Sequence, residues 1–191
     1  VTLNEIAADD EPRIDLHDAE LNRVLGGGLV QGSLVLIGGE PGIGKSTLVL
    51  QTMLQIPEKR ILYISGEESA RQLKLRADRL QANHSSNCLI VCETSLEQIY
   101  VHIKNTTPDL IIIDSIQTMW LDNVESAPGS VSQVRAAAHE LVIVQPLVVP
   151  GRLCRAGGRR RGHPAHGEIP QPVHGVGVMV GLPGAVVGVF L

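Results

Sequence analysis

The chain has 191 residues, of which 43% are hydrophobic, so it is long enough for one α/β domain with a packed core. Its formal net charge of −4 argues against a protein that coats nucleic acid through bulk positive charge, although a local basic groove is compatible with it. The three cysteines have no regular spacing, which excludes a disulfide framework. The N-terminus is acidic and polar, and no apolar run reaches about 18 residues, so we expect no signal peptide, no membrane span and a cytoplasmic location.

Composition divides the chain into three segments. Residues 1–15 are predicted to form an acidic linker and residues 16–140 a globular domain. Residues 141–191 contain 10 Gly, 6 Pro and 11 Val, and their five Arg and one Glu give a net charge of +4. No helical or alternating period is visible past about Leu141, because the prolines each remove a backbone donor. We therefore expect a disordered or frameshifted tail, in which 176–181 is at most a weak strand with little to pair with.

Strands and helices are predicted to alternate through the globular segment. Short, continuous apolar runs predict buried strands at 34–37, 61–64, 89–91 and 110–113. Helical patterns are expected at 46–55, 68–80, 96–104 and 130–140. This alternation predicts the α/β class, with a mostly parallel sheet and helices on both of its faces. Cys88 and Cys92 flank the third strand and are interpreted as buried core cysteines.

A phosphate-binding loop follows the first predicted strand. Residues 39–46 match the pattern G-x-x-x-x-G-K-[ST], and a predicted helix begins directly after them. In such a loop successive backbone N–H groups face one anion, and the N-terminus of the helix reinforces them. Lys45 is expected to reach the β- and γ-phosphates of ATP, and Ser46 to offer its hydroxyl to Mg²⁺. The predicted nucleotide-binding residues are Gly39, Glu40, Pro41, Gly42, Ile43, Gly44, Lys45, Ser46 and Thr47.

Carboxylates follow two other predicted strands at the edge where ligands bind in parallel sheets. Asp114 ends the run 110–113 and is predicted to hold Mg²⁺, the alternative being a helix or turn cap. Glu67 and Glu68 follow the run 61–64, and one of them is expected to orient and deprotonate the attacking water. The alternative is an acidic first turn that suits the helix dipole. We predict Glu67 as the base and, with Lys45, as a catalytic residue.

With these residues in place, the chain resembles the ATPase domain of the RadA (Sms) family of bacterial DNA repair proteins, which is RecA-like. The resemblance covers about residues 12–140, in blocks at 21–29, 38–51, 63–69, 112–118 and 126–135. It implies a RecA-like P-loop NTPase fold that uses ATP and Mg²⁺. It also implies ATP hydrolysis linked to single-stranded or branched DNA in recombinational repair, and a homo-hexameric ring. By the same resemblance, Glu67 would be the catalytic glutamate. The loop 120–130, which lacks Lys and Arg, would be the first loop that faces DNA.

The chain departs from this family in several features. The family begins with a four-cysteine zinc finger, and no such spacing occurs here, so zinc is not expected. Its later core strands and its Lys-Asn-Arg-Phe-Gly motif are not found either, so we expect a sheet that is incomplete at its C-terminal strands. Because the chain also begins at Val1, we interpret it as part of a longer protein. Two alternatives to an active ATPase stay open: a nucleotide-binding remnant without turnover, and another RecA-like ATPase.

We predict that residues 141–191 are an out-of-frame translation of GC-rich DNA that begins near residues 139–142. Gly, Pro, Arg, Ala and Val dominate there, and GC-rich codons encode several of these residues in any frame. The alternative is a genuine low-complexity basic tail. Reading the coding DNA in the other two frames tests this prediction. A globular-looking sequence is expected in one of them, and finding none would overturn the frameshift.

Overall fold

A six-stranded sheet forms the centre of the computed structural model, which describes residues 2, 12–80, 87–144, 177–180 and 185–189. The strand order is β5-β4-β6-β8-β3-β7, and every neighbouring pair is parallel except β7 with β3. The predicted α/β class with a mostly parallel sheet is confirmed. The strands are β3 (Ser33–Ile37), β4 (Ile61–Ser65), β5 (Cys88–Cys92), β6 (Leu110–Asp114), β7 (Gly177–Val180) and β8 (Ala185–Val189).

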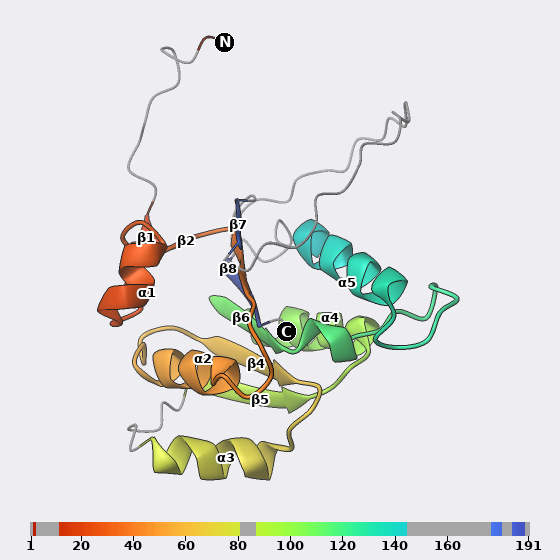
Figure 1. Ribbon diagram of the computed structural model, residues 1–191, viewed down its shortest axis with the longest axis horizontal. Coiled ribbons are helices and arrows are strands. Elements are labelled where there is room, and N and C mark those ends of the chain that lie inside the picture. The colour runs from red at the N-terminus through yellow and green to blue at the C-terminus, as the bar shows by residue number, and fades with distance from the viewer. Residues whose placement is uncertain (1, 3–11, 81–86, 145–176, 181–184, 190–191) are drawn as a thin grey trace.

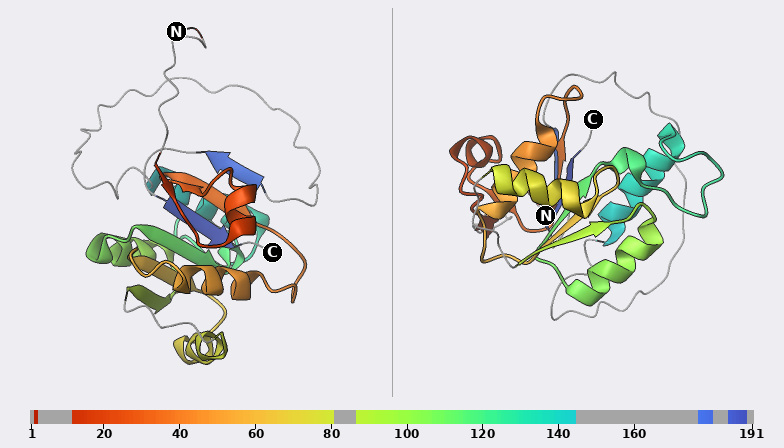
Figure 2. Two further views of the ribbon diagram at one scale, coloured as in Figure 1. Left: turned by 90° about the vertical axis from the view of Figure 1, so that its left-hand side faces the viewer. Right: turned by 90° about the horizontal axis from the view of Figure 1, so that it is seen from below.

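Helices cover both faces of this sheet (Figures 1 and 2). The helices α2 and α3 lie on one face, and α4 and α5 lie on the other. Their bounds agree with the predicted ranges to within four residues at each end. None of the helices in the described parts of the chain has the length and apolar character needed to cross a membrane. The helices are α1 (Ala19–Val24), α2 (Lys45–Leu54), α3 (Ala70–Arg79), α4 (Leu96–Thr106), α5 (Val131–Val144) and the 3₁₀ turn η2 (Ile116–Thr118).

The central strands are buried on both faces, and alternate side chains enter two separate apolar clusters. In β4, Ile61 and Tyr63 pack with α2 and α3, whereas Leu62 and Ile64 pack with α4 and α5. The strand β6 alternates in the same way. Because successive strand side chains point to opposite faces, Tyr63 and Asp114, which lies opposite Ser65, share the face covered by α2 and α3.

A small antiparallel pair precedes the main sheet. The strands β1 (Arg13–Ile14) and β2 (Leu29–Val30) pair with each other, and α1 lies between them in the sequence. The glycine-rich turn connects α1 to β2. Nη1 of Arg13 donates to the carbonyl oxygens of Leu25 at 2.9 Å and Gly28 at 3.2 Å. Arg13 therefore fixes the path of the turn that leads the chain into β3, the strand before the phosphate-binding loop.

The C-terminal segment contributes two strands to the sheet, which corrects part of the sequence-based expectation. The strand β7 pairs with β3, and β8 lies between β3 and β6 with parallel pairing to both. The expectation that 176–181 has little to pair with was therefore wrong, because the edge of β3 is its partner. The predicted domain boundary at 140 falls inside α5, which ends at Val144. Residues 145–176 lie outside the described residues, and the frameshift stays a prediction.

The interpretation of both strand cysteines as core residues was wrong for Cys92. Among the described residues, the strand β5 is at the edge of the sheet and pairs with β4 alone. Cys88 is half-buried, and burial raises the pKa of its thiol to about 11. Cys92 is exposed, and its thiol contacts the carbonyl oxygen of Glu68 at 3.5 Å.

We predict that replacing Gly66 by alanine destabilises the fold. A Cβ atom at this position would lie 1.8 Å from Oγ1 and 2.6 Å from Cβ of Thr118. Thr118 cannot turn away freely, because its hydroxyl donates to the carbonyl oxygen of Ser115 at 2.8 Å. Relieving such overpacking costs about 1–3 kcal/mol, which thermal or denaturant unfolding of Gly66→Ala would show.

Gly38→Ala is the matched control for this prediction. A Cβ atom at Gly38 would meet no other atom within 4 Å. We expect this variant to unfold with the parent chain's free energy, within about 0.5 kcal/mol. Equal stability of the Gly66 and Gly38 variants would contradict the close packing of β4 against η2.

Candidate functional site

Three segments that are far apart in the sequence line one pocket of about 310 Å³. The loop after β3 forms one wall, the residues after β4 form a second, and the end of β6 forms a third. Lys45, Ser46, Glu67 and Asp114, all predicted as site residues, are among those lining it. The complete lining is Pro41, Gly42, Gly44, Lys45, Ser46, Thr47, Glu67, Glu68, Arg76, Asp114 and Ser115.

The phosphate-binding loop turns through glycine conformations that other residues rarely adopt. Gly42 has φ 82° and Gly44, the N-cap of α2, has φ 103°. Nζ of Lys45 donates to the carbonyl oxygens of Gly39 at 2.6 Å and Glu40 at 2.9 Å. Gly39, Glu40 and Ile43 are not among the lining residues, and Ile43 is 72% exposed. The loop thus folds around the ammonium group at the N-terminal end of α2, where an anion is favoured.

Asp114 is held by a buried tyrosine. The hydroxyl of Tyr63 donates to Oδ2 of Asp114 at 2.6 Å, and Tyr63 has no exposed surface. Burial, followed by the neighbouring charge of Asp114, raises the pKa of the Tyr63 hydroxyl far above its usual value. The hydroxyl is therefore a permanent donor. The Ser46 hydroxyl and the Asp114 carboxylate supply the oxygen ligands that Mg²⁺ prefers, so the residues of this pocket fit that ion.

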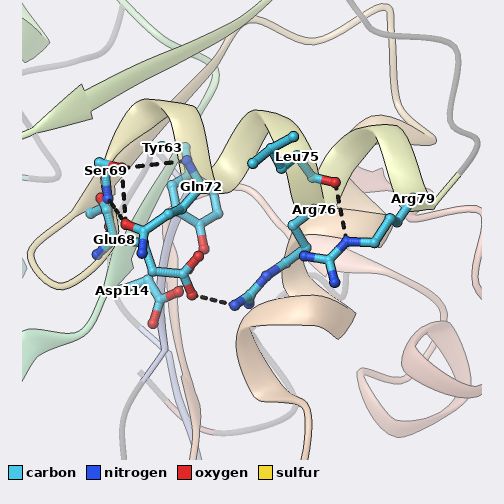
Figure 3. Close-up of polar contacts among 9 residues, drawn as sticks. Tyr63, Glu68, Ser69, Gln72, Leu75, Arg76, Arg79 and Asp114 are labelled. Atoms are coloured by element: carbon cyan, nitrogen blue, oxygen red, sulfur yellow. Dashed lines mark hydrogen bonds and ion pairs between the residues drawn. The ribbon is translucent and has the colours of Figure 1, made fainter.

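The two glutamates after β4 have different partners. Oε1 of Glu67 accepts a hydrogen bond of 2.8 Å from the hydroxyl of Ser115, which follows β6. Glu68 instead pairs with Arg76 of α3 (Figure 3), and the two side chains are only 23% and 27% exposed. The hydroxyl of Ser65 contacts both the backbone N–H and the carbonyl oxygen of Glu68 and so fixes its main chain. Glu67 thus stays exposed, whereas Glu68 is engaged in an ion pair.

Three residues that line or support the pocket were not predicted as site residues: Tyr63, Arg76 and Ser115. Arg76 had a detectable signal, because residues 68, 72 and 76 repeat at the spacing that aligns side chains on one helical face. Gln72 also closes the capping box with Ser69 at the start of α3. Tyr63 gave no signal, because it lies in an apolar run and resembles any core aromatic.

The formal charges around the pocket do not balance a triphosphate. Lys45 and Arg76 are the cations of the lining, and Glu67, Glu68 and Asp114 are the carboxylates, so their sum is −1. Repulsion would oppose a polyphosphate in such a pocket unless a dication accompanied it. Among the described residues, no group of three or more His, Cys, Asp or Glu side chains is arranged to hold a metal ion.

The loop that follows η2 is fixed to α5 by Gln133. Its amide Nε2 donates to the carbonyl oxygens of Leu121, Val124 and Ser126 at 3.1–3.2 Å. Its Oε1 accepts from the N–H of Leu121 at 3.0 Å, and the side chain is 2% exposed. This is the loop predicted to face DNA. Asp122 and Glu125 are exposed on it, and Arg135 is exposed on α5.

Comparison with known proteins agrees with this geometry. The AAA domain family matches residues 4–143. The DNA repair protein RadA of Bacillus subtilis is 47% identical over 162 residues, which are 81% of this chain and 35% of that protein. RadA of Halalkalibacterium halodurans is 53% identical over 135 residues, which are 70% of this chain and 29% of that protein. RadA of Chlamydia muridarum is 51% identical over 144 residues, which are 74% of this chain and 31% of that protein.

The chain spans about a third of the length of these curated relatives. The matched part contains the pocket, both glutamates and the loop fixed by Gln133. The chain therefore belongs to the AAA domain family, and its P-loop domain is a RecA-like ATPase domain of the RadA type.

Proposed function

We propose that this chain binds ATP with Mg²⁺ and carries the hydrolytic centre of a DNA-dependent ATPase in recombinational DNA repair. The observation that supports this proposal best is the single pocket that joins Lys45, Ser46, Glu67 and Asp114. A phosphate-binding loop alone would support nucleotide binding only. The exposed carboxylate of Glu67, which lines the same pocket, supports hydrolysis as well.

Each side chain has a distinct part in the proposed reaction. The backbone N–H groups of the loop and the ammonium of Lys45 bind the phosphates, and Ser46 and Asp114 would hold Mg²⁺. When bound, Mg²⁺ neutralises charge on the β- and γ-phosphates. Glu67 accepts a proton from water as the water oxygen bonds to the γ-phosphorus and the bond to the ADP oxygen breaks. The Ser115 hydroxyl keeps the Glu67 carboxylate oriented toward the pocket.

The DNA substrate and the assembly belong to the proposal through the relatives. The matched proteins are named as DNA repair proteins, and 46–53% identity over more than two thirds of this chain supports a related role. Action on single-stranded or branched DNA, a homo-hexameric ring and a cytoplasmic location extend the same relationship. The loop fixed by Gln133 carries acidic and hydroxyl side chains, so contact with DNA phosphates would need cations from elsewhere in the assembly.

A nucleotide-binding remnant without turnover is the second candidate. The chain spans about a third of the length of its relatives. If neighbouring subunits or later segments of those proteins complete the hydrolytic site, this chain alone would bind nucleotide without turnover. Nucleotide binding without hydrolysis would favour this candidate. Another RecA-like ATPase is disfavoured by the identity to RadA proteins along the whole matched region.

We predict that the chain hydrolyses ATP with Mg²⁺, and faster when single-stranded DNA is added. Lys45→Ala should lower turnover roughly 100-fold or more, because one pre-positioned cation at the transferred phosphate is lost. Release of inorganic phosphate measures this directly. No phosphate above the Lys45→Ala background, with nucleotide binding retained, would leave the remnant as the better description.

We predict that the two neighbouring glutamates differ in their effect on turnover. Glu67→Gln should lower the rate of hydrolysis roughly 100- to 10,000-fold while leaving nucleotide binding intact, because a general base is lost. Glu68→Gln is the matched substitution and should lower the rate less, since Glu68 is engaged with Arg76. A larger loss of turnover in Glu68→Gln than in Glu67→Gln would reverse the assignment of the base.

A further inference from the structure

We propose that Tyr63 is a positioning residue for the metal site, acting through the hydrogen bond from its hydroxyl to the Asp114 carboxylate. This inference rests on the proposed function, since it concerns the Mg²⁺ that would accompany ATP. Tyr63 itself does not line the pocket, so it would not touch the ion or the nucleotide. Its effect would be to fix which oxygen of Asp114 faces the pocket.

The sheet places these two side chains within reach of each other. Ser65 lies opposite Asp114 in the parallel pair of β4 and β6, and Tyr63 precedes Ser65 by two residues on the same face. Such diagonal neighbours are too far apart for most side chains, but an aromatic one spans the gap. The hydroxyl donates to Oδ2 of Asp114 at 2.6 Å, and Figure 3 shows Tyr63 and Asp114 close to Glu68.

The buried hydroxyl is best explained by this one contact. Tyr63 has no exposed surface and packs in the apolar cluster with α2 and α3, where phenylalanine would fill the same space. Burying a hydroxyl costs free energy unless it is hydrogen-bonded, and among the described residues the partner of this hydroxyl is Asp114. The tyrosine therefore adds an interaction with Asp114 that the core does not need for packing.

The hydrogen bond from Tyr63 engages only one of the two carboxylate oxygens of Asp114. Oδ2 of Asp114 receives the Tyr63 hydroxyl, and within the described part of the chain no hydrogen bond to Oδ1 is found. Asp114 is 8% exposed and lines the pocket together with Ser46. With one oxygen held, the carboxylate cannot rotate freely, so the other oxygen stays available to Mg²⁺ or to its water shell. Outer contacts of this kind orient metal ligands, and losing one commonly lowers metal affinity about 10- to 100-fold.

The test uses Tyr63→Phe in the full chain, with a fluorescent methylanthraniloyl derivative of ATP as the probe. Binding is measured first in excess chelator and then as Mg²⁺ is titrated at fixed nucleotide. We expect Tyr63→Phe to bind the probe normally without Mg²⁺ and to need about 10-fold more Mg²⁺ for half of the metal-dependent change. Normal binding in chelator also shows that the variant is folded.

Two further variants make the test specific. Tyr100→Phe removes the other tyrosine hydroxyl of the chain, a buried group on α4 with no hydrogen-bond partner among the described residues, and should leave the Mg²⁺ dependence at the parent value. Asp114→Asn should lose most of the metal-dependent change. If Tyr63 acts through Asp114, adding Tyr63→Phe to Asp114→Asn should cause no further loss.

The outcomes separate this inference from the proposed function. A parent chain that binds the probe equally with and without Mg²⁺ would count against the function itself. A parent that depends on Mg²⁺, with Tyr63→Phe showing the same dependence, would overturn only the role of Tyr63. Equal weakening by Tyr63→Phe in chelator and in Mg²⁺ would also overturn it, because a loss of that kind reflects the fold and not the metal site.

Discussion

The pairing of β4 with β6 sets the positions of the three carboxylates in the pocket, Glu67, Glu68 and Asp114. Ser65 lies opposite Asp114, and the N–H of Gly66 extends the ladder by donating to the carbonyl oxygen of Asp114 at 2.9 Å. A shift of one residue would turn the side chains of one strand to the opposite face. Tyr63 would then leave Asp114, and Glu67 would leave Ser115. The apolar clusters on both faces oppose such a shift, so packing in the core also fixes the chemistry at the edge.

The three carboxylates of the pocket carry like charges, and each has a different hydrogen-bonding partner. Asp114 is held by a neutral donor, Glu67 by another neutral donor, and Glu68 by a guanidinium. A neutral hydroxyl orients a carboxylate without adding a charge, whereas the guanidinium of an ion pair places a full positive charge beside it. In the proposed function, these three acidic groups would serve as a metal ligand, a base and a structural partner.

The parts predicted from the sequence are those with a local signature. The loop around Lys45 has a fixed spacing, and the continuous apolar runs of β4 and β6 identify buried parallel strands, so their polar ends were expected to meet. The pairs Tyr63–Asp114 and Ser115–Glu67 join residues about 50 positions apart, and nothing in either segment alone specifies them. The strand β8 was missed for the same reason. This short Val-rich segment forms a strand because it pairs with both β3 and β6, which lie on either side of it.

Gln133 holds the backbone of the loop after η2 through contacts that do not depend on which side chains the loop carries. The amide contacts main-chain atoms of the loop, which every amino acid except proline supplies in the same form. Exposed positions such as Asp122 and Glu125 therefore have little part in these contacts. Related proteins could exchange those side chains, and even reverse the charge of the surface, while the backbone path persisted. One buried glutamine would then allow the outer surface to diversify over evolution at little cost to the fold.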